Sequence, residues 1–246
     1  MPTLSIIVPV YNEARQLEEV VRMLFKTQYP CEREWIFVDD CSKDKSLEIL
    51  ERLAKEFPMK IIKQNPNQGK GAACIRGIKE AKGDLVMIQD ADFEYDPSDV
   101  PSLLDPLLNG KADVVYGSRF KKSAMQVHHT YHYFVNRFLT MLSNMFSGIY
   151  LTDMETCYKI FRRDLLQSMQ LKSQRFGIEV ELTAYLGKIR TRVYELPISY
   201  YPRSYLQGKK ITWKDGFAAL GHILRYNWFT SYEKAFSGLP ERYLPR

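Results

Sequence analysis

The sequence lacks the marks of a membrane span, of a secreted disulfide framework and of a zinc site. No run of 18 apolar residues occurs in its 246 residues, so we expect no ordinary transmembrane helix. A strand pattern begins directly after the N-terminus, without the pattern of a signal peptide. The four cysteines form no Cys-x-x-Cys pair, which argues against zinc and disulfides. These absences predict a cytoplasmic protein that is either soluble or peripheral to a membrane.

Acidic residues are scarce in the second half of the chain. Residues 1–110 carry 14 Lys and Arg against 19 Asp and Glu, whereas residues 111–246 carry 21 against 10. The two parts have net charges of −5 and +11, within a total of +6. A basic total favours nucleic acid, a membrane surface or a phosphate-bearing substrate as partner. Because the charge is unevenly divided and no recognition motif is present, we expect no nucleic-acid partner.

What the chain does contain is a regular alternation of strand and helix patterns. Hydrophobic residues make up 45% and no linker is visible, so we expect a single domain over residues 1–246. Short apolar runs predict buried strands at residues 4–10, 35–38, 60–63, 85–88 and 114–116. Stretches of helical spacing separate these runs. The pattern predicts an α/β fold, with a mostly parallel sheet flanked by helices.

Polar residues follow the predicted strands at the point where each strand ends. They lie at residues 9–13, 39–40, 90–94 and 117–119. Ligands of such sheets bind beyond the carboxyl ends of the strands, so we expect a nucleotide there. Asn12 is expected to cap the helix after the first strand, and Asp96 with Pro97 to begin a later one.

The second half is less regular and contains two amphipathic stretches. An apolar stripe within residues 131–150 contains Phe134, Phe138, Met141, Leu142, Met145 and Phe146. A second stretch covers residues 213–229, and strands are expected near residues 157–161 and 192–198, with a helix near 178–188. Each amphipathic stretch has two interpretations: it lies on a membrane surface, or it packs against the sheet.

Two carboxylates one residue apart follow the fourth predicted strand. Asp90 and Asp92 can share one hard divalent cation, and Glu94 can add a third oxygen. Such a cation would neutralise a diphosphate leaving group. An Asp-x-Asp pair alone is a weak motif, and a solvated turn before Asp96 is the alternative. The position at a strand end favours the metal.

Other polar groups at the strand ends suit a nucleotide. One carboxylate of Asp39 and Asp40 is expected to accept hydrogen bonds from a base or ribose, while the other caps the helix that begins near Asp44. Residues 67–71 form a glycine loop at a helix start, where Lys70 and backbone N–H groups can meet phosphate. A simple tight turn is the alternative for this loop.

Five basic residues of the second half are candidates for binding phosphate. They are Arg119, Arg137, Arg203, Lys209 and Lys210. The planar fork of arginine matches phosphate oxygens. Each of these residues, taken alone, is equally compatible with an ordinary surface position.

Several short motifs occur in a distinctive order. They read Ile-Val-Pro-Val-Tyr-Asn-Glu, Val-Asp-Asp-Cys-Ser, Asn-Gln-Gly-Lys-Gly-Ala-Ala, Asp-Ala-Asp, Gly-Ser-Arg, Thr-Asp-Met-Glu-Thr-Cys-Tyr-Lys, Tyr-Pro-Arg-Ser and Gly-Lys-Lys. This series resembles that of family-two glycosyltransferases with the GT-A fold. The later motifs look like the dolichol-phosphate mannose synthase branch. The chain has no Gln-x-x-Arg-Trp, the mark of processive members.

The resemblance implies a division of the chain into a nucleotide-sugar half, residues 1–118, and an acceptor half, residues 119–246. The donor site would contain Pro9, Tyr11, Glu13, Val38, Asp39, Asp40, Lys70, Asp90, Ala91 and Asp92. Mg²⁺ or Mn²⁺ would be held by Asp90, Asp92 and Glu94, although close relatives often have Gln at the last position. The catalytic set would be Asp90, Asp92 and Arg119. The acceptor phosphate would be held by Arg119, Arg137, Arg203, Lys209 and Lys210.

The resemblance also implies a reaction. A hexose, first of all mannose from GDP-mannose, would move to a polyprenyl or dolichyl phosphate with inversion at the anomeric carbon. A phosphate monoester is largely dianionic near neutral pH and needs little help from a general base. The enzyme would work peripherally on the cytoplasmic face of a membrane, and a membrane-anchoring partner subunit is compatible with this arrangement.

Three other functions remain open at this point. The first is a family-two enzyme that uses UDP-glucose or another UDP-sugar. The second transfers to a sugar hydroxyl in polysaccharide or lipopolysaccharide synthesis, which requires a general base such as Asp153 or Glu181. A basic nucleic-acid-binding protein is the remote third, and it predicts salt-sensitive binding to random duplex.

Overall fold

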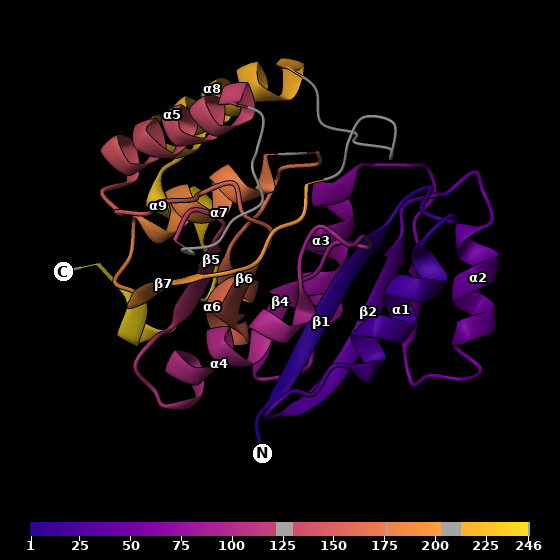
Figure 1. Ribbon diagram of the computed structural model, residues 1–246. Coiled ribbons are helices and arrows are strands. Elements are labelled where there is room, and N and C mark those ends of the chain that lie inside the picture. Colours follow the sequence, from indigo (N-terminus) through magenta and orange to yellow (C-terminus); the bar gives the residue numbers. More distant parts are fainter. Residues whose placement is uncertain (122–129, 176, 203–212, 246) are drawn as a thin grey trace.

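The computed structural model describes residues 1–121, 130–175, 177–202 and 213–245, which form a sheet flanked by helices (Figure 1). Within these residues the strand order of a seven-stranded sheet is β3-β2-β1-β4-β6-β5-β7. The strands are β1 (Thr3–Val10), β2 (Glu32–Asp39), β3 (Lys60–Lys63), β4 (Leu85–Ile88), β5 (Val114–Ser118), β6 (Lys159–Arg162) and β7 (Val193–Pro197). The α/β class and the five strands expected in the first half are confirmed.

The helices alternate with the strands, as the sequence pattern predicts for the first half. They are α1 (Leu17–Lys26), α2 (Ser46–Leu53), α3 (Lys70–Glu80), α4 (Val100–Leu108), α5 (Thr130–Ser147), α6 (Arg163–Ser168), α7 (Ile178–Leu186), α8 (Trp213–Trp228) and α9 (Tyr232–Ala235). Short 3₁₀ turns cover Pro97–Asp99 and Glu241–Tyr243. The expected cap is confirmed at Asp96, whose side chain accepts a hydrogen bond from the Ser98 backbone N–H, with Pro97 beginning the turn.

One strand runs against the rest of the sheet. β6 is antiparallel to both of its neighbours, β4 and β5, while all the other pairs are parallel. Because β6 is reversed, its first residue lies at the edge where β4 and β5 end. The segment that leads into β6, residues 152–158, therefore reaches the predicted ligand edge.

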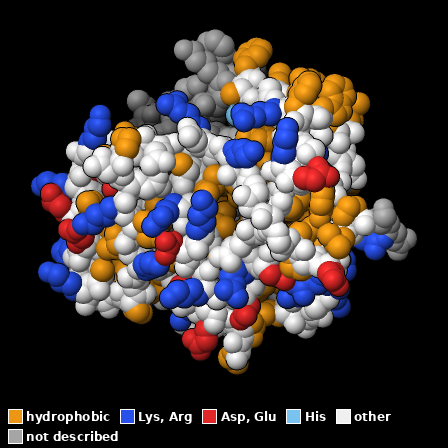
Figure 2. All heavy atoms as spheres, turned by 180° about the vertical axis from the view of Figure 1, so that it is seen from behind, with side chains coloured by type: hydrophobic (Ala, Val, Ile, Leu, Met, Phe, Trp, Pro, Cys, Tyr) orange, Lys and Arg blue, Asp and Glu red, His pale blue; other side chains and the backbone are white. Residues whose placement is uncertain are grey.

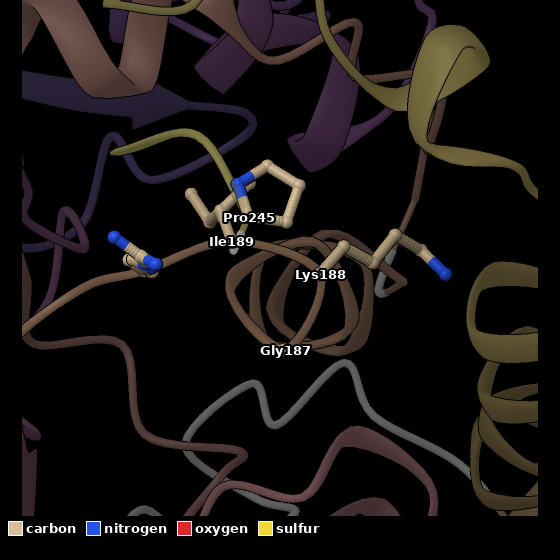
Figure 3. Close-up of a pocket in the computed structure, with 5 residues that line it drawn as sticks. Gly187, Lys188, Ile189 and Pro245 are labelled. Carbon is tan, nitrogen blue, oxygen red and sulfur yellow. The ribbon is translucent and has the colours of Figure 1, made fainter. Parts of the chain in front are cut away.

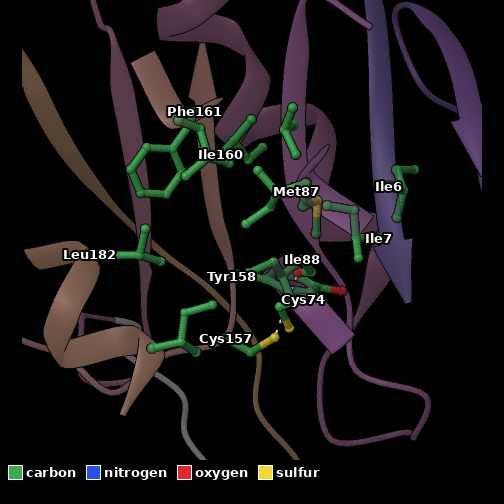
Figure 4. Close-up of a cluster of buried hydrophobic side chains, with 14 of the residues drawn as sticks. Ile6, Ile7, Cys74, Met87, Ile88, Cys157, Tyr158, Ile160, Phe161 and Leu182 are labelled. Atoms are coloured by element: carbon green, nitrogen blue, oxygen red, sulfur yellow. Dashed lines mark hydrogen bonds between the residues drawn. The ribbon is translucent and has the colours of Figure 1, made fainter. Parts of the chain in front are cut away.

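The core lies between the sheet and its helices. Figure 4 shows side chains from β1, β4, β6, α3 and α7 meeting there. Ile7, Ile160 and Leu182 are at most 1% exposed, and burial of an aliphatic side chain contributes about 1.5–3 kcal/mol. The buried phenol of Tyr158 donates to Oε1 of Gln89 over 2.7 Å, so this polar group is satisfied inside the core.

The expectation that Asn12 caps the first helix is wrong. Asn12 has a positive φ of 52°, and α1 begins five residues later at Leu17, after a turn closed by the Glu13 carbonyl. The Asn12 side chain instead accepts a hydrogen bond from the Lys43 backbone N–H over 2.8 Å. Asn tolerates the left-handed region better than most residues, which suits this tight turn.

Three helices of the second half pack together at one end of the molecule. α8 contacts both α5 and α7, and Figure 1 shows α5 and α8 side by side above the sheet. In the described parts of the chain, no helix combines the length and the apolar character needed to cross a membrane.

The apolar stripe of α5 is largely exposed. Phe134, Phe138, Met141 and Met145 are between 50% and 71% exposed, whereas Leu142 and Phe146 pack against the core. α8 and the residue after it expose Phe217, Leu224, Trp228 and Phe229. Hydrophobic side chains gather at this end of the molecule (Figure 2). Packing against the sheet is therefore the wrong interpretation for four members of the α5 stripe.

Candidate active site

The carboxyl ends of β1, β2 and β4 lie side by side. β1 pairs with both of the other strands, and the last residue of β1, Val10, is in register with Asp39 of β2. Pro9 and Val38 face each other in the same register. This alignment brings residues 9–13, 38–40 and 90–92 to one edge, as the sequence predicts for the nucleotide-sugar site.

The loop after β1 is tied to the loop after β2. The backbone N–H groups of Asn12, Glu13 and Ala14 donate to the side chains of Ser42, Ser46 and Asp44 over 2.9–3.1 Å. Glu13 also accepts a hydrogen bond from the side-chain amide of Gln16. The loop that carries Tyr11 and Glu13 is therefore fixed before any ligand arrives.

Asp39 and Asp40 have different surroundings although both are 2% exposed. The Asp40 carboxylate accepts hydrogen bonds from the Asn67 side chain and from the N–H groups of Gln68 and Gly69. Asp39 Oδ2 accepts from the Ser42 N–H, and its Oδ1 has no hydrogen-bond partner among the described residues. Asp40 therefore holds the glycine loop, and Asp39 retains an acceptor atom.

Neither of these two aspartates caps the next helix. The N-cap of α2 is Lys45. Asp44, one residue earlier, accepts hydrogen bonds at its Oδ1 from both the backbone N–H and the hydroxyl of Ser46, the first residue of the helix.

The glycine loop fits closely against a segment far away in the sequence. A Cβ at Gly69 would lie 2.5 Å from the Gln174 carbonyl oxygen, and a Cβ at Gly71 would lie 2.2 Å from that of Ser173. The Ala72 N–H donates to the Gln174 carbonyl over 3.0 Å. The start of α3 is thus fixed beside residues 173–175, which lead towards α7.

Lys70 points to carboxylates. Its Nζ lies 2.8 Å from Asp90 Oδ1 and 3.5 Å from Glu179 Oε1. Burial acts to lower the pKa of Lys70, but the neighbouring anionic groups, Asp90 first, overcome this and raise the pKa well above its usual value. Lys70 therefore stays protonated and positively charged inside the predicted donor site.

The loop after β4 is held by residues from the other end of the sheet. Asp92 is 5% exposed, and its Oδ1 accepts from the Glu94 N–H over 2.9 Å. Glu94 Oε2 accepts from the Tyr200 hydroxyl over 3.0 Å, and the Glu94 carbonyl accepts from the Tyr201 N–H. Glu94 is thus turned towards the segment after β7.

The carboxylates after β4 suit a cation that also binds substrate. In the described ranges no three His, Cys, Asp or Glu side chains come together as a metal-ligating group. Mg²⁺ typically takes one or two carboxylates together with substrate phosphates and water. Hard oxygen donors at Asp90 and Asp92 fit such an ion, whereas the Tyr200 hydrogen bond at Glu94 leaves its part as a ligand a proposal.

Arg119 forms a buried ion pair with Asp153. Arg119 Nε and Nη2 each lie 2.7 Å from a different oxygen of Asp153, and the Arg119 backbone N–H also donates to Asp153. The two side chains are 8% and 0% exposed. The Arg119 guanidinium carbon lies 5.1 Å from the centre of the Tyr200 ring. These contacts fix one edge of the guanidinium, and three of its five N–H groups are not used by the pair.

Arg137 contacts the backbone next to Asp153. Its Nη1 donates to the Thr152 carbonyl over 3.1 Å, directly before Asp153. Glu195 of β7 accepts from the backbone N–H groups of both Thr152 and Asp153 and forms an ion pair with Lys121. The structure therefore brings together two of the predicted phosphate-binding residues, Arg119 and Arg137. The other three, Arg203, Lys209 and Lys210, lie outside the described residues.

Both residues named as candidate general bases have structural partners. The two oxygens of Asp153 accept from Arg119. Glu181 is fully buried and accepts from the N–H groups of Lys172 and Ser173 and from the Tyr185 hydroxyl. Neither carboxylate is positioned to take a proton from a sugar hydroxyl, which weighs against that alternative.

A group of buried charges lies close to Asp153. Burial, together with the charge of Glu179, raises the pKa of Glu155 to about 7. Burial lowers the pKa of Lys159, which donates to the Thr156 carbonyl. Oxygens of Glu155, Thr156 and Glu179 are buried without a hydrogen-bond partner among the described residues.

Sequence reasoning missed Glu179, Glu195 and Tyr200. One signal was available for Glu179. Apolar residues occur on every side of a helix over residues 178–186, and Glu179 and Glu181 are its only charged members. Such a helix is expected to be buried all round, so its carboxylates need partners.

A separate pocket of about 440 Å³ lies beyond the last residue of α7 (Figure 3). It is at the opposite end of α7 from Glu179, and its lining contains none of the predicted site residues. The lining consists of Gly187, Lys188, Ile189, Arg190 and Pro245.

The chain resembles known protein sequences over most of its length. A model of the family described as "Glycosyl transferase family 2" matches residues 5–169. The chain is 30% identical over 231 residues to a dolichol-phosphate mannosyltransferase of Pyrococcus furiosus, and the match covers 90% of this chain and 62% of that protein. It is 27% identical to a UDP-N-acetylglucosamine–dolichyl-phosphate N-acetylglucosaminyltransferase of Methanococcus voltae, covering 89% of this chain and 94% of that protein.

Solved structures show the same fold. A glucosyl-3-phosphoglycerate synthase of Mycobacterium tuberculosis, solved with Mn²⁺, UDP and its product, superposes with a TM-score of 0.70 at 18% identity. The match covers 92% of this chain and 80% of that one. The expected GT-A fold is confirmed.

The buried ion pair gives a testable prediction about stability. Asp153→Asn leaves the Arg119 guanidinium buried without its counter-ion and should lower the free energy of unfolding by about 3 kcal/mol. Urea denaturation at neutral pH measures the change. Glu18→Gln, which breaks an exposed pair with Arg52, is the control and should have a much smaller effect. Equal losses in the two variants would contradict the assignment.

Proposed function

Because the chain belongs to glycosyl transferase family 2, we propose that it transfers a hexose from a nucleotide-sugar donor to a polyprenyl phosphate. The observation that carries the proposal is the meeting of two features at one sheet edge. Asp90 and Asp92 follow β4, and the buried Arg119–Asp153 pair lies at the end of β5 with Arg137 beside the same turn. The first feature suits a diphosphate with its cation, and the second suits a phosphate acceptor.

The donor side is formed by the loops after β1, β2 and β4. Tyr11 and Glu13 lie on a loop that is already fixed, and Asp39 retains an oxygen that can accept a base or ribose hydrogen. GDP-mannose is the first choice of donor, and the name of the Pyrococcus furiosus relative supports mannose as the sugar. A UDP-sugar is the second candidate, because the Methanococcus voltae relative is named for one.

A divalent cation, Mg²⁺ or Mn²⁺, fits beside Asp90 and Asp92. When bound, it would supply positive charge where negative charge develops on the leaving nucleoside diphosphate. The glucosyl-3-phosphoglycerate synthase that shares the fold was solved with Mn²⁺. The Lys70 ammonium adds a further positive charge to this part of the site.

The acceptor side needs positioning more than proton transfer. Arg119 is oriented by Asp153 and by the ring of Tyr200, so its guanidinium is held in place before the acceptor arrives. A dianionic phosphate can attack without a base. We therefore expect a single displacement with inversion at the anomeric carbon. Arg203, Lys209 and Lys210 remain proposed partners of the phosphate.

The exposed apolar side chains of α5 and α8 are proposed to rest on the membrane that holds the acceptor lipid. Phe134 and Met145 are 65% and 71% exposed, and Phe217 and Trp228 on α8 are 67% and 65% exposed. An amphipathic face of this kind can lie at the boundary between headgroups and acyl chains. The polyprenyl tail would then stay in the bilayer while its phosphate enters the site from the cytoplasmic face. The arrangement accommodates a membrane-anchoring partner subunit.

A donor panel tests the proposed reaction. The protein is incubated with polyprenyl phosphate, Mn²⁺ or Mg²⁺ and radiolabelled GDP-mannose, UDP-glucose or UDP-N-acetylglucosamine, and labelled lipid is extracted into organic solvent. We expect one donor to give labelled lipid with inverted configuration. Asp92→Asn should lower kcat/KM by about 100-fold. Asp96→Asn, in the same loop but serving as a helix cap that Asn can replace, is the matched control. Full activity in Asp92→Asn, or a product with retained configuration, would refute the mechanism.

Flotation tests the membrane face. We expect the protein to co-float with vesicles that contain anionic lipid, and the double variant Phe134→Ser/Met145→Ser to co-float several-fold less. Basic groups near such a surface add about 1 kcal/mol each, so binding should weaken with salt. Leu108→Ser, at the end of α4, is the control and should behave as the wild type. A wild-type protein that never co-floats at low salt would contradict the proposal.

A further inference from the structure

Three charged side chains from three separate elements form a chain of contacts beside the predicted cation site. Lys70 begins α3, Asp90 follows β4, and Glu179 lies in the first turn of α7. The Lys70 ammonium lies 2.8 Å from Asp90 and 3.5 Å from Glu179. The three side chains are 20%, 18% and 10% exposed, so water screens these charges only in part.

The contact of Lys70 with Glu179 is the longer of the two, and the Glu179 carboxylate can accept a further hydrogen bond. Its Oε2 is buried without a hydrogen-bond partner in the described part of the chain. A buried acceptor without a partner costs about 1–3 kcal/mol. Lysine carries three N–H donors on a flexible stem. A closer contact between Lys70 and Glu179 would therefore give the Oε2 atom of Glu179 a hydrogen-bond donor.

The backbone around this lysine holds it next to α7. Gly71 packs so closely on residues 173–175 that a Cβ there would meet the Ser173 carbonyl oxygen at 2.2 Å. The Ala72 N–H donates to the Gln174 carbonyl, three residues before Gly177, the N-cap of α7. The backbone positions of Lys70 and Glu179 are thus fixed relative to each other. Only the Lys70 side chain has to move for its ammonium to exchange Asp90 for Glu179.

A divalent cation on Asp90 would meet the Lys70 ammonium at the same carboxylate. Like charges at that separation repel each other strongly in a partly buried site. Among the described residues, the second carboxylate within ion-pair distance of Lys70 is that of Glu179.

We propose that Lys70 forms its ion pair with Asp90 when no divalent cation is bound, and that it forms its ion pair with Glu179 instead when a cation binds at Asp90. Glu179 is a positioning residue, because it acts on the cation through Lys70. The inference rests on the proposed function, since it presumes that a cation binds at Asp90. It explains why a buried glutamate with an unpartnered oxygen lies next to the site, and how a cation is admitted without releasing a buried charge into solvent.

A double-mutant cycle on Mn²⁺ binding tests this exchange. Mn²⁺ is titrated into the nucleotide-free full chain, and the free ion is followed by electron paramagnetic resonance. Lys70→Met removes the competing charge and should tighten Mn²⁺ binding by about fivefold. Glu179→Gln removes the second partner and should weaken it by about fivefold. In the Lys70→Met background the Glu179→Gln change should shrink to less than about twofold, because contacting residues are coupled.

Two results would overturn the exchange. Glu179→Gln could weaken Mn²⁺ binding equally in both backgrounds, which would make its effect a through-space charge effect only. Lys70→Met could weaken Mn²⁺ binding, which would mean that the lysine does not compete with the cation. Lys70→Gln replaces Lys70→Met if circular dichroism shows that the latter does not fold. Asp113→Asn is the matched control: it removes a buried carboxylate paired with Arg192 at the other end of β5, and it should leave Mn²⁺ binding unchanged.

A parallel titration with GDP or UDP present separates this inference from the proposed function. If the wild type binds no Mn²⁺ with or without nucleotide, the proposed cation at Asp90 is wrong, and the exchange of Lys70 between Asp90 and Glu179 is refuted as well. If the wild type binds Mn²⁺ and the cycle is additive, the proposed function stands and the exchange alone is refuted.

Discussion

The buried ion pair between Arg119 and Asp153 is the interaction on which the proposed acceptor side of the site depends. Arg119 directly follows β5, and Asp153 lies on the segment that leads into the reversed strand β6. Either charge alone would be costly at this depth, so each fixes the position of the other. Glu195 and Arg137 then attach to the same turn through Thr152. One pair thereby sets the placement of two arginines, and it also occupies a carboxylate that could otherwise have served as a base.

Much of the fold could be predicted from the sequence, because periodicity and turn chemistry are local properties. The five apolar runs of the first half became strands, and Asp96 with Pro97 began a turn. The expectation that Asn12 is a cap is wrong, because Asn12 has a positive φ and its side chain accepts a hydrogen bond from the Lys43 backbone N–H in another loop. The antiparallel direction of β6 was also not predictable, since apolar spacing carries no information about strand direction.

The candidate site, like the fold, was predictable only in part. The residues at strand ends, such as Asp39 and Asp90, could be located in advance because parallel strands place their carboxyl ends at one edge. Their partners could not. The different environments of Asp39 and Asp40 arise from the loop at residues 67–69. The link from Lys70 to Glu179 depends on the close fit of Gly71 against residues 173–175. Contacts between distant segments have no local signature.

The uneven charge of the chain is consistent with a division of labour at this edge. The part with a net charge of −5 contributes Asp39, Asp90 and Asp92, and the part with +11 contributes Arg119 and Arg137. The proposed reaction therefore requires an acceptor that ends in phosphate. Transfer to polyprenyl phosphate and to the unphosphorylated polyprenol of the same length, from one donor, is the direct measurement. Labelled lipid should form with the phosphate alone, and comparable transfer to the free alcohol would contradict the account.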